Sequence, residues 1–439
     1  MNEGLKDVIP DPQKRIDHIL HNQVYGIAIT QLTALLTRRS VYCSKDASGK
    51  YSLSHFDNSD GNIRFKETKH LWENGSCKYC GASKAVQDRG KGKEAHAYEF
   101  IHRRIQEIIN MRFDVVISNP PYQLSDGGGL GGSSAKPIYN MFVEAAKKLN
   151  PKYLVMIIPS RWFAGGKGLD EFRDSMLSDS KIRVLNDYMD AADCFPGVEI
   201  KGGVCYFLWN RDNEGKCKVI THKQGKIISE ALRPFKEEGS NVFIRYNEAV
   251  PIFKKVNSFK EKTFDVFVST RQPFGFSVLP EHPKDKLYNV LLYQRGGTTY
   301  CKENDVRRNL EWLQKPKVLI SKAYNAGDSF PHQVINKPFI ASSNSACTET
   351  YLVIGPFESK QYCENVISYI QTKFFRLLVL LRKSSQNAAK GVYEFVPVQD
   401  FSKPWTDAEL YKKYGLTQKE IDFIESMIKP MELGGDSNG

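Results

Sequence analysis

The chain has 439 residues, of which 41% are hydrophobic and 26% are charged, so it can bury a large core and is expected to form more than one domain. No apolar run reaches the roughly 18 residues of a membrane helix, and residues 1–13 lack the pattern of a signal peptide. The net charge of +12 favours nucleic acid as a partner, because lysine and arginine release counterions from phosphates. Nine mostly isolated cysteines fit a reducing cytoplasm better than a disulfide scaffold.

Helices and wholly apolar strands alternate through the first half of the chain. This rhythm predicts an α/β fold with a parallel, doubly wound sheet, in which ligands bind at the carboxyl ends of strands. From about residue 216 onward the rhythm is lost. In chain order we predict a helix over 12–22, a strand over 24–29, a helix over 30–40 with Leu32, Leu35 and Leu36 on one face, a polar insertion over 43–95, a helix over 98–110, a strand over 113–117, a glycine-rich loop over 125–135, a helix over 137–149, and then strands over 153–158, 182–188, 203–209 and 217–221 with a helix over 169–177 among them.

The strand predicted over 113–117 ends abruptly at Asn119-Pro120-Pro121-Tyr122. Two adjacent prolines have no backbone donors and a fixed φ, so neither a strand nor a helix can continue through them. The sequence therefore places a side-chain amide, a backbone carbonyl and an aromatic ring at a strand end. The simplest alternative is a tight turn with a packed tyrosine.

Methylation of an amino group on a base needs such groups. The nitrogen lone pair is delocalised into the ring, and two acceptors on its hydrogens would return electron density to the nitrogen. The Asn119 side-chain carbonyl and the Pro120 backbone carbonyl can be those acceptors, and Pro121 fixes their orientation before the reaction. Tyr122 offers a ring on which a base can stack once it has left the duplex, a contact worth roughly 1–3 kcal/mol.

Three segments carry a resemblance to a known family. They are "FDVVISNPPYQ" (113–123), "KPIYNMFVEAAKKLNPKYLVMIIPSRWFAGGKGLDEFR" (136–173) and "CFPGVEIKGGVCYFLW" (194–209). The chain resembles the amino-group, adenine-specific DNA methyltransferases of bacterial restriction-modification systems. The resemblance implies a Rossmann-like sheet that uses S-adenosylmethionine, double-stranded DNA as the substrate, direct methyl transfer to a flipped adenine, and a cytoplasmic location. Similar enzymes place an aromatic residue on the other face of the base, and Phe195 matches that position; its alternative role is that of a core phenylalanine.

The cofactor-binding segment of that family is missing from the expected place. It should be a strand and a small glycine loop before the Asn-Pro-Pro-Tyr motif, yet Gly4 is the only glycine before the strand predicted over 24–29. In that strand, Ala28 stands where the family has an acid that binds the cofactor ribose. No cofactor-binding residue is therefore assigned. We expect the first strand of the sheet to come from a separate, upstream polypeptide; alternatively, the chain is a catalytically inactive DNA-binding or specificity remnant.

The insertion holds Cys77-Lys78-Tyr79-Cys80-Gly81, which has the shape of a zinc knuckle. Cys43 and His70 are the predicted further ligands, with His55 and His96 as reserves, and zinc would tie together a polar segment without a core of its own. The alternative is a pair of reduced surface cysteines.

The domain organisation predicted from these patterns has three parts. Residues 1–215 form a partial catalytic domain with the insertion at 43–95, residues 216–400 form an α+β target-recognition domain, and residues 401–439 form a C-terminal helix and tail. In the recognition domain, basic and aromatic side chains are expected to contact phosphates and bases: Arg307, Arg308, Trp312, Lys315, Lys317, Arg376, Arg382 and Lys383. Glu199-Ile200-Lys201, with Asp190 or Asp193 upstream, also resembles a metal-dependent nuclease motif, but it overlaps the methylase match around Phe195.

Overall fold

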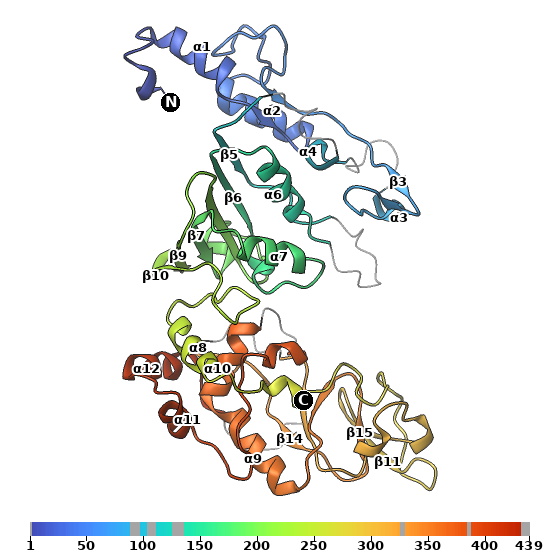
Figure 1. Cartoon of the computed structure of the whole chain (residues 1–439). Helices are drawn as coiled ribbons and strands as arrows, with labels where there is room; N and C mark the ends of the chain where they lie inside the picture. The colour runs from blue at the N-terminus through green and yellow to red at the C-terminus, as the bar shows by residue number, and fades with distance from the viewer. Residues whose placement is uncertain are drawn as a thin grey trace. The chain divides into compact units, whose positions relative to one another are not determined.

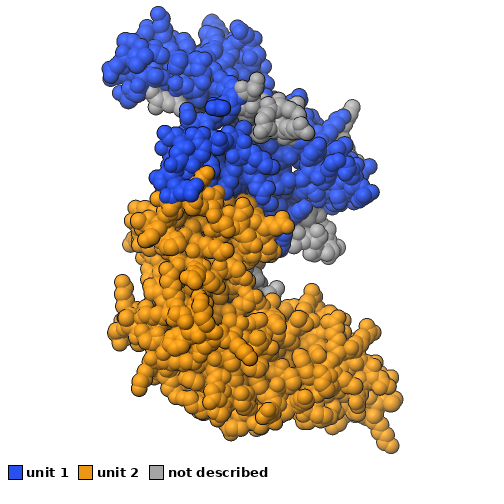
Figure 2. All heavy atoms as spheres, viewed as in Figure 1, with its two compact units in different colours: residues 1–158, 167–169, 206–214 blue, residues 159–166, 170–205, 215–439 orange. Residues whose placement is uncertain are grey.

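The structure is a computed structural model (Figure 1) that describes residues 2–87, 97–102, 111–124, 136–324, 330–383 and 388–431. The chain divides into two compact units (Figure 2). The first unit comprises residues 1–158, 167–169 and 206–214, and the second comprises residues 159–166, 170–205 and 215–439. The division falls inside the segment predicted as the catalytic domain, and the predicted domain boundaries stay a prediction.

The first unit begins with two capped helices. The Asp11 side chain accepts a hydrogen bond from the Lys14 backbone N–H at the start of α1 (Pro12–Asn22), and Thr30 caps α2 (Gln31–Tyr42). Between them lies β1 (Gly26–Ile27), which pairs in parallel with β2 (Ile63–Arg64). The strand predicted over 24–29 is therefore only two residues long.

Helix α2 buries a different face from the predicted one. Ala34, Arg38 and Tyr42 are its buried residues, whereas Leu32 and Leu36 are exposed. Arg38 donates to the carbonyl of Ile63 at 2.8 Å and pairs with Asp60 at 2.6 Å, so this face holds α2 against β2. Of the three leucines predicted to share a face, Leu32 and Leu36 are exposed and Leu35 is half-buried.

A six-stranded sheet follows, with the strand order β10-β9-β7-β8-β6-β5. Its members are β5 (Val115–Ser118), β6 (Tyr153–Pro159), β7 (Ile182–Tyr188), β8 (Val204–Asn210), β9 (Cys217–Lys223) and β10 (Lys226–Arg233). The pairs β5–β6 and β7–β9 are parallel, and β9–β10 is antiparallel, so the sheet is mixed rather than wholly parallel. Strand β9 lies beside β7, although β8 directly precedes it in sequence.

Helices connect the parallel strands, as the apolar rhythm predicts. Helix α6 (Tyr139–Lys148) lies between β5 and β6 in sequence, and α7 (Asp170–Leu177) lies between β6 and β7. The remaining elements of the first unit are short: β3 (Trp72–Glu73), β4 (Ser76–Cys77), α3 (Lys84–Gln87) and α4 (Glu99–His102). Most of the helix predicted over 98–110 and all of the glycine-rich loop at 125–135 lie outside the described residues.

In the second unit, residues beyond the sheet form one large core and one smaller core. The large core joins α8 (Ala249–Ser258), α9 (Lys360–Gln371), α10 (Lys373–Arg382), α11 (Asp407–Lys413) and α12 (Gln418–Met427). The smaller core lies largely around two three-stranded sheets, β12-β11-β15 (Gly297–Cys301, Val290–Gln294, Ser345–Cys347) and β14-β13-β16 (Phe339–Ile340, Val318–Ser321, Tyr351–Ile354). The C-terminal helices therefore share a core with residues 242–396.

The fold is thus of the mixed α/β class. Among the described residues, no helix combines the length and the apolar character that a membrane crossing would require.

Candidate active site

The Asn-Pro-Pro-Tyr turn (Asn119, Pro120, Pro121 and Tyr122) directly follows β5, at its carboxyl end. Pro120 is buried, whereas Asn119 is exposed. Downstream, the turn is held by a short antiparallel pairing with the segment before α6. The backbone N–H of Ile138 donates to the carbonyl of Tyr122 at 3.2 Å, and that of Leu124 donates to the carbonyl of Lys136 at 2.9 Å. The turn is therefore fixed at both ends, and the Asn119 amide is accessible.

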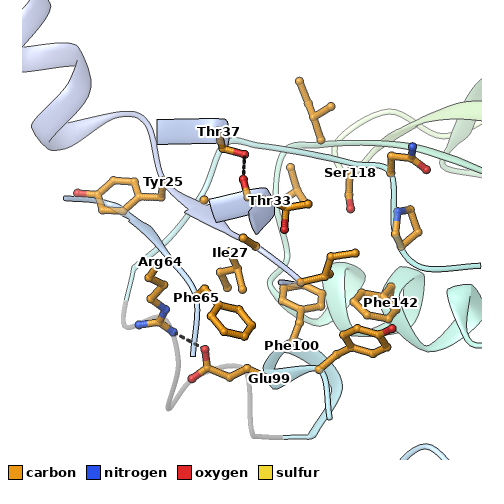
Figure 3. Close-up of a pocket in the computed structure, with 18 of the residues that line it drawn as sticks. Tyr25, Ile27, Thr33, Thr37, Arg64, Phe65, Glu99, Phe100, Ser118 and Phe142 are labelled. Carbon is orange, nitrogen blue, oxygen red and sulfur yellow. Dashed lines mark hydrogen bonds and ion pairs between the residues drawn. The ribbon is translucent and has the colours of Figure 1, made fainter. Parts of the chain in front are cut away.

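Three residues of the turn line a cavity of about 650 Å³ in the first unit (Figure 3). The cavity lies between β1 and β5, because Gly26 and Ile27 line it together with residues 115–118. Small-molecule sites typically measure about 300–1,000 Å³ and are largely apolar, so this cavity is large enough for a nucleotide-sized ligand. Its walls are completed by α2, α4 and α6, which contribute Thr33, Thr37, Glu99, Phe100 and Phe142.

The residues present do not by themselves make a complete S-adenosylmethionine site. Ala28 lines the cavity at the end of β1 and offers no acceptor for ribose hydroxyls. Glu99 is the only acidic residue among the described residues of the wall, and its carboxylate lies 3.6 Å from the Arg64 guanidinium (Figure 3). The apolar walls and the Asn119 amide suit a base or a nucleoside, but the described wall lacks a free acid for the ribose.

Strand β5 is exposed in a way that is unusual for an apolar strand. The Val115 side chain is 47% exposed and that of Ile117 is 77% exposed. By contrast, β6 alternates between buried and half-buried residues. Within the described part of the chain, β5 is hydrogen-bonded to β6 on one side and forms the edge of the sheet on the other.

A second group of functional side chains lies in the insertion. His70, Cys77, Cys80 and His102 each offer one ligand atom, and these four atoms lie within 4.8 Å of one another. Four zinc ligands were predicted from the sequence. Three of them, His70, Cys77 and Cys80, come together in this group. Cys43 is exposed and does not belong to the group, and His102 takes the fourth position. His55 is also outside the group, and His96 lies outside the described residues.

Sequence reasoning missed His102 because it lies 22 residues after Cys80, beyond the usual spacing of a knuckle. His102 is the last residue of α4, and its Nδ1 lies 2.8 Å from the carbonyl of Tyr98, the residue before that helix. The fourth ligand therefore depends on tertiary structure: α4 must fold against the knuckle before the His102 side chain is in place.

Phe195 belongs to the second unit, in the loop that follows a 3-10 helix (Ala191–Asp193). Its backbone N–H donates to the carbonyl of Ala191 at 2.8 Å, and its side chain is half-buried. That it stacks on a base opposite Tyr122 stays a prediction.

The second unit contains a buried ion pair that the sequence did not indicate. Asp187, near the end of β7, is fully buried, and its two carboxylate oxygens each accept a hydrogen bond from Arg245 at 2.7 Å. The Ser160 hydroxyl donates to the same carboxylate at 3.1 Å, and Arg245 also donates to the carbonyl of Gly202 at 2.9 Å. The pair therefore links β7 to three other segments: Ser160 after β6, Gly202 before β8 and Arg245 after β10.

Two of the basic residues predicted to contact DNA are buried. Lys317 is fully buried and donates to the carbonyls of Trp312 and Leu313, and burial lowers its pKa to about 8. Arg376 is also fully buried, and it donates to four backbone carbonyls, including that of Lys429 at 2.7 Å. Each satisfies carbonyls that would otherwise be unpaired in the core, so neither can reach a phosphate.

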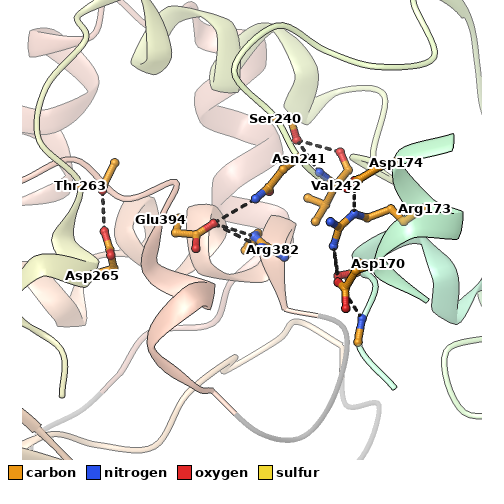
Figure 4. Close-up of polar contacts among 12 residues, drawn as sticks. Asp170, Arg173, Asp174, Ser240, Asn241, Val242, Thr263, Asp265, Arg382 and Glu394 are labelled. Atoms are coloured by element: carbon orange, nitrogen blue, oxygen red, sulfur yellow. Dashed lines mark hydrogen bonds and ion pairs between the residues drawn. The ribbon is translucent and has the colours of Figure 1, made fainter. Parts of the chain in front are cut away.

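The other predicted contacts differ in exposure. Arg382 pairs with Glu394, whose carboxylate also accepts a hydrogen bond from Asn241 (Figure 4). Lys383 donates a hydrogen bond to the carbonyl of Val334. Trp312 is half-buried, whereas Arg307, Arg308 and Lys315 are exposed. Three cations thus remain available on the surface of the smaller core.

The nuclease-like residues do not converge. Among the described residues, the His70 group alone brings three or more His, Cys, Asp or Glu ligand atoms together, so Glu199 forms no such group with Asp190 or Asp193. Instead, Asp190 accepts a hydrogen bond from the Ala192 N–H, and Asp193 accepts one from the Gly225 N–H. Both acids stabilise turns.

Comparison with known proteins agrees with the site. Residues 22–195, which include Ala28 and the Asn-Pro-Pro-Tyr turn, match the family described as Eco57I restriction-modification methylase. An "Uncharacterized adenine-specific methylase" of Mycoplasma pneumoniae (strain ATCC 29342 / M129 / Subtype 1) is 36% identical over 252 residues, which cover 52% of this chain and 60% of the relative. The resemblance to adenine-specific methylases of restriction-modification systems is therefore confirmed, although the chain spans only about 60% of that relative's length.

Solved structures of restriction-modification enzymes also align with the chain. The Type ISP enzyme LlaGI, in complex with a DNA substrate mimic, has a TM-score of 0.45 and 10% identity over 88% of this chain and 41% of its own. The Type IIL enzyme MmeI, in complex with DNA, has a TM-score of 0.40 and 10% identity over 93% of this chain and 64% of its own.

Proposed function

We propose that the protein is an adenine-specific DNA methyltransferase that transfers the methyl group of S-adenosylmethionine to the exocyclic amino group of a flipped adenine. The observation that carries this proposal is the position of the Asn-Pro-Pro-Tyr turn. It lies at the carboxyl end of a sheet strand, and Asn119, Pro120 and Pro121 line a cavity large enough for a nucleoside. The match of residues 22–195 to a methylase family supports the same reaction.

The residues of the turn have separate roles in this reaction. The Asn119 side-chain oxygen and the Pro120 carbonyl accept hydrogen bonds from the two amino hydrogens of the adenine, which makes the nitrogen more nucleophilic. Tyr122 stacks on the base after it leaves the duplex, and Phe195 covers its other face. S-adenosylmethionine supplies an electrophilic methyl group when it is bound.

The substrate is double-stranded DNA, which fits the net charge of +12 and the exposed Arg307, Arg308 and Lys315. The described part of the cavity wall offers no free acid for the cofactor ribose, which supports a contribution to the cofactor site from outside the described residues. We assign that contribution to a separate polypeptide.

A methyl-transfer assay tests the proposal. Purified chain is incubated with plasmid DNA and radiolabelled S-adenosylmethionine, alone and together with the polypeptide encoded immediately upstream, and the labelled nucleoside is identified. The expected product is N6-methyladenine, formed when both polypeptides are present. Labelled cytosine, or no label in any combination, contradicts the assignment; a normal rate for the chain alone contradicts the need for a partner.

One alternative has a specific observation in its favour. The absence of an acid at Ala28 also fits a catalytically inactive DNA-binding or specificity remnant of a methylase. Such a remnant would retain DNA on a filter but transfer no methyl group with or without the upstream polypeptide. Calorimetric titration of S-adenosylmethionine into the chain and into the two-polypeptide mixture separates the cases before any assay of turnover, since the remnant binds none in either.

A further inference from the structure

We propose that His70, Cys77, Cys80 and His102 bind one structural Zn²⁺ ion. The four ligand atoms lie within 4.8 Å of one another, and two of their separations match those that tetrahedral zinc imposes. The Cys77 Sγ is 3.5 Å from the His102 Nε2, and the Cys80 Sγ is 3.5 Å from the His70 Nδ1. Zn–S bonds of about 2.3 Å and Zn–N bonds of about 2.0 Å place tetrahedral ligands roughly 3.4–3.8 Å apart.

The histidine tautomer fits the same assignment. A backbone carbonyl can only accept, so the contact between the His102 Nδ1 and the Tyr98 carbonyl at 2.8 Å puts the ring proton on Nδ1. The lone pair of Nε2 then points toward the cysteine sulfurs. Hydrogen bonding of the remote ring nitrogen to a carbonyl is the usual arrangement of a zinc-bound histidine.

Burial explains why the site needs a cation. Cys77, Cys80 and His102 are each at most 6% exposed, and among the described residues the two cysteines belong to a small cluster only. Gly81, with a φ of +68°, turns the chain directly after the second cysteine, as a knuckle requires. Two buried thiols and two imidazoles in contact make poor packing partners for one another, whereas a zinc ion satisfies all four.

The ion would also hold the catalytic turn. Cys77 and Cys80 pack in a small cluster with Ile101, Leu124 and Met141. Leu124 lies two residues after Tyr122, and Met141 lies in α6, so the cluster contacts the segment that directly follows the turn and the helix that begins after its pairing partner. Zinc is thus a positioning element for the active site and takes no part in the chemistry.

Elemental analysis of the full chain, purified without added metal, tests this proposal. We expect one zinc per chain in the wild type and in Cys43→Ser, the control at an exposed cysteine, and at least about a tenfold loss of zinc in Cys80→Ser and in His102→Ala. If those variants do not fold, Co²⁺ exchange into the wild type gives a second readout, because thiolate ligation produces a charge-transfer band.

Two results would overturn the zinc site: a metal-free wild type that also fails to bind Co²⁺, or a Cys77–Cys80 disulfide in the protein as isolated. The positioning role has its own readout. Chelation is expected to increase amide hydrogen exchange at residues 122–124 and 136–138, and unchanged exchange there contradicts it.

Independently, the geometry of β5 points to a docking site for one β-strand of a separate polypeptide. The cavity of the first unit separates two parallel ladders, β1–β2 and β5–β6, and residues of β1 and β5 line it from opposite ladders. A strand inserted between β1 and β5, parallel to both, would join the two ladders into one sheet. This inference deepens the proposed function, because the inserted strand is what completes the cofactor site.

The open edge of β5 has none of the features that protect sheet edges. Its sequence, Val115 to Ser118, contains no charge, no proline and no irregularity. The strand at the other end of the sheet order, β10, carries Lys226, Glu230 and Arg233 and has a register shift after Ile227. Unprotected apolar edges are templates for strand addition, whereas charges and bulges block it.

The chemistry of the partner strand follows from its neighbours. It must be apolar on the face that it shares with Val115 and Ile117, because these two side chains are exposed. It needs about four residues to match β5.

Co-purification with the upstream polypeptide tests this docking site without DNA or cofactor, so its outcome is separate from that of the methylation assay. Ile117→Lys puts a charge at a solvent-exposed position, so the isolated chain is expected to fold, but complex formation should weaken at least about tenfold. Ile227→Lys on β10 is the matched control and should leave the complex unchanged.

Hydrogen exchange gives a second measurement: amides of residues 115–118 should gain protection in the complex. An equally strong complex with Ile117→Lys, or no complex with wild type, overturns the proposal. So does a homodimer of the chain alone that Ile117→Lys dissociates, because a second copy would then occupy the edge.

Discussion

At the scale of single residues, the reaction depends on a side chain that the fold leaves uncovered. Asn119 is exposed at a strand end, whereas its neighbour Pro120 is buried and fixes the backbone. Asn119→Ala should lower methyl transfer by about 10²–10³-fold, the usual effect of removing one preorganised hydrogen-bonding group, because the amino nitrogen then lacks one acceptor. DNA retention should not change. Single-turnover kinetics measure the loss, and Asn213→Ala, at an exposed turn, is the control; equal activity of both variants contradicts the role of Asn119.

Asp187 is a residue whose charge has no access to water. Asp187→Ala would leave the Arg245 guanidinium without its partner and should lower the free energy of unfolding of the second unit by about 3–5 kcal/mol. Asp212, which forms an exposed pair with Arg211, provides the comparison, and Asp212→Ala should change stability by at most about 1 kcal/mol. Urea unfolding of both variants measures the difference, and similar midpoints would show that the buried pair is not a source of stability.

At the scale of elements, the C-terminal helices are part of the second unit rather than an appendage. Ile424 of α12 is fully buried in the core that α8, α9 and α10 also form. Ile424→Ala should therefore cost about 2–5 kcal/mol through lost burial and the resulting cavity. Leu232→Ala, at a 66% exposed position of β10, should cost less than about 0.5 kcal/mol. Thermal unfolding checks both; a small effect at Ile424 would mean that α12 frays without unfolding its core.

The sequence predicted those elements whose burial depends on their own residues. Strands β6 and β7 were found within a residue: β6 is apolar over its whole length, and β7, although it carries Arg183, Asn186 and Asp187, is bounded by turns as β6 is. Strand β5 was also found, but not its exposure, since that depends on a neighbouring strand. The same holds for α2, where Leu32 and Leu36 have the spacing of a buried face and yet are open.

The candidate site could be predicted only where its residues are adjacent in the sequence. The Asn-Pro-Pro-Tyr turn and the Cys77–Cys80 knuckle are local motifs, and both occupy the positions that their spacing implies. His102 and the pair of Asp187 with Arg245 come from distant segments, 58 residues apart in the latter case, and no local pattern marks them. Lys317 has the sequence surroundings of a surface lysine, and only the packed structure shows the carbonyls around it.

At the scale of the whole molecule, buried thiols make stability depend on alkaline pH. Burial raises the pKa of Cys205, Cys217 and Cys301 to about 12, whereas an unfolded thiol ionises near 8.5. The folded pKa is raised, so this stabilisation is complete below about pH 8.5 and is lost as the pH rises toward 12, by at most about 1.4 kcal/mol per pH unit for each thiol. Denaturant unfolding at pH 8 and 10 should show a smaller loss in Cys205→Ala than in wild type, and Cys43→Ser should match wild type.

The net charge of the whole chain should determine how strongly the DNA affinity depends on salt concentration. Each phosphate contact contributes about −0.9 to the slope of log affinity against log salt concentration, because a counterion is released. Arg308→Ala and Lys315→Ala, at exposed positions, should each reduce the slope by about 0.9, whereas Lys412→Ala on α11 serves as an exposed control away from the smaller core. Lys317→Met should leave the slope unchanged and alter only stability, because its ammonium group is fully buried among backbone carbonyls. A smaller slope in Lys317→Met than in wild type would show that this lysine reaches the phosphates after a rearrangement, and equal slopes for Arg308→Ala, Lys315→Ala and wild type would move the DNA-binding surface elsewhere on the chain.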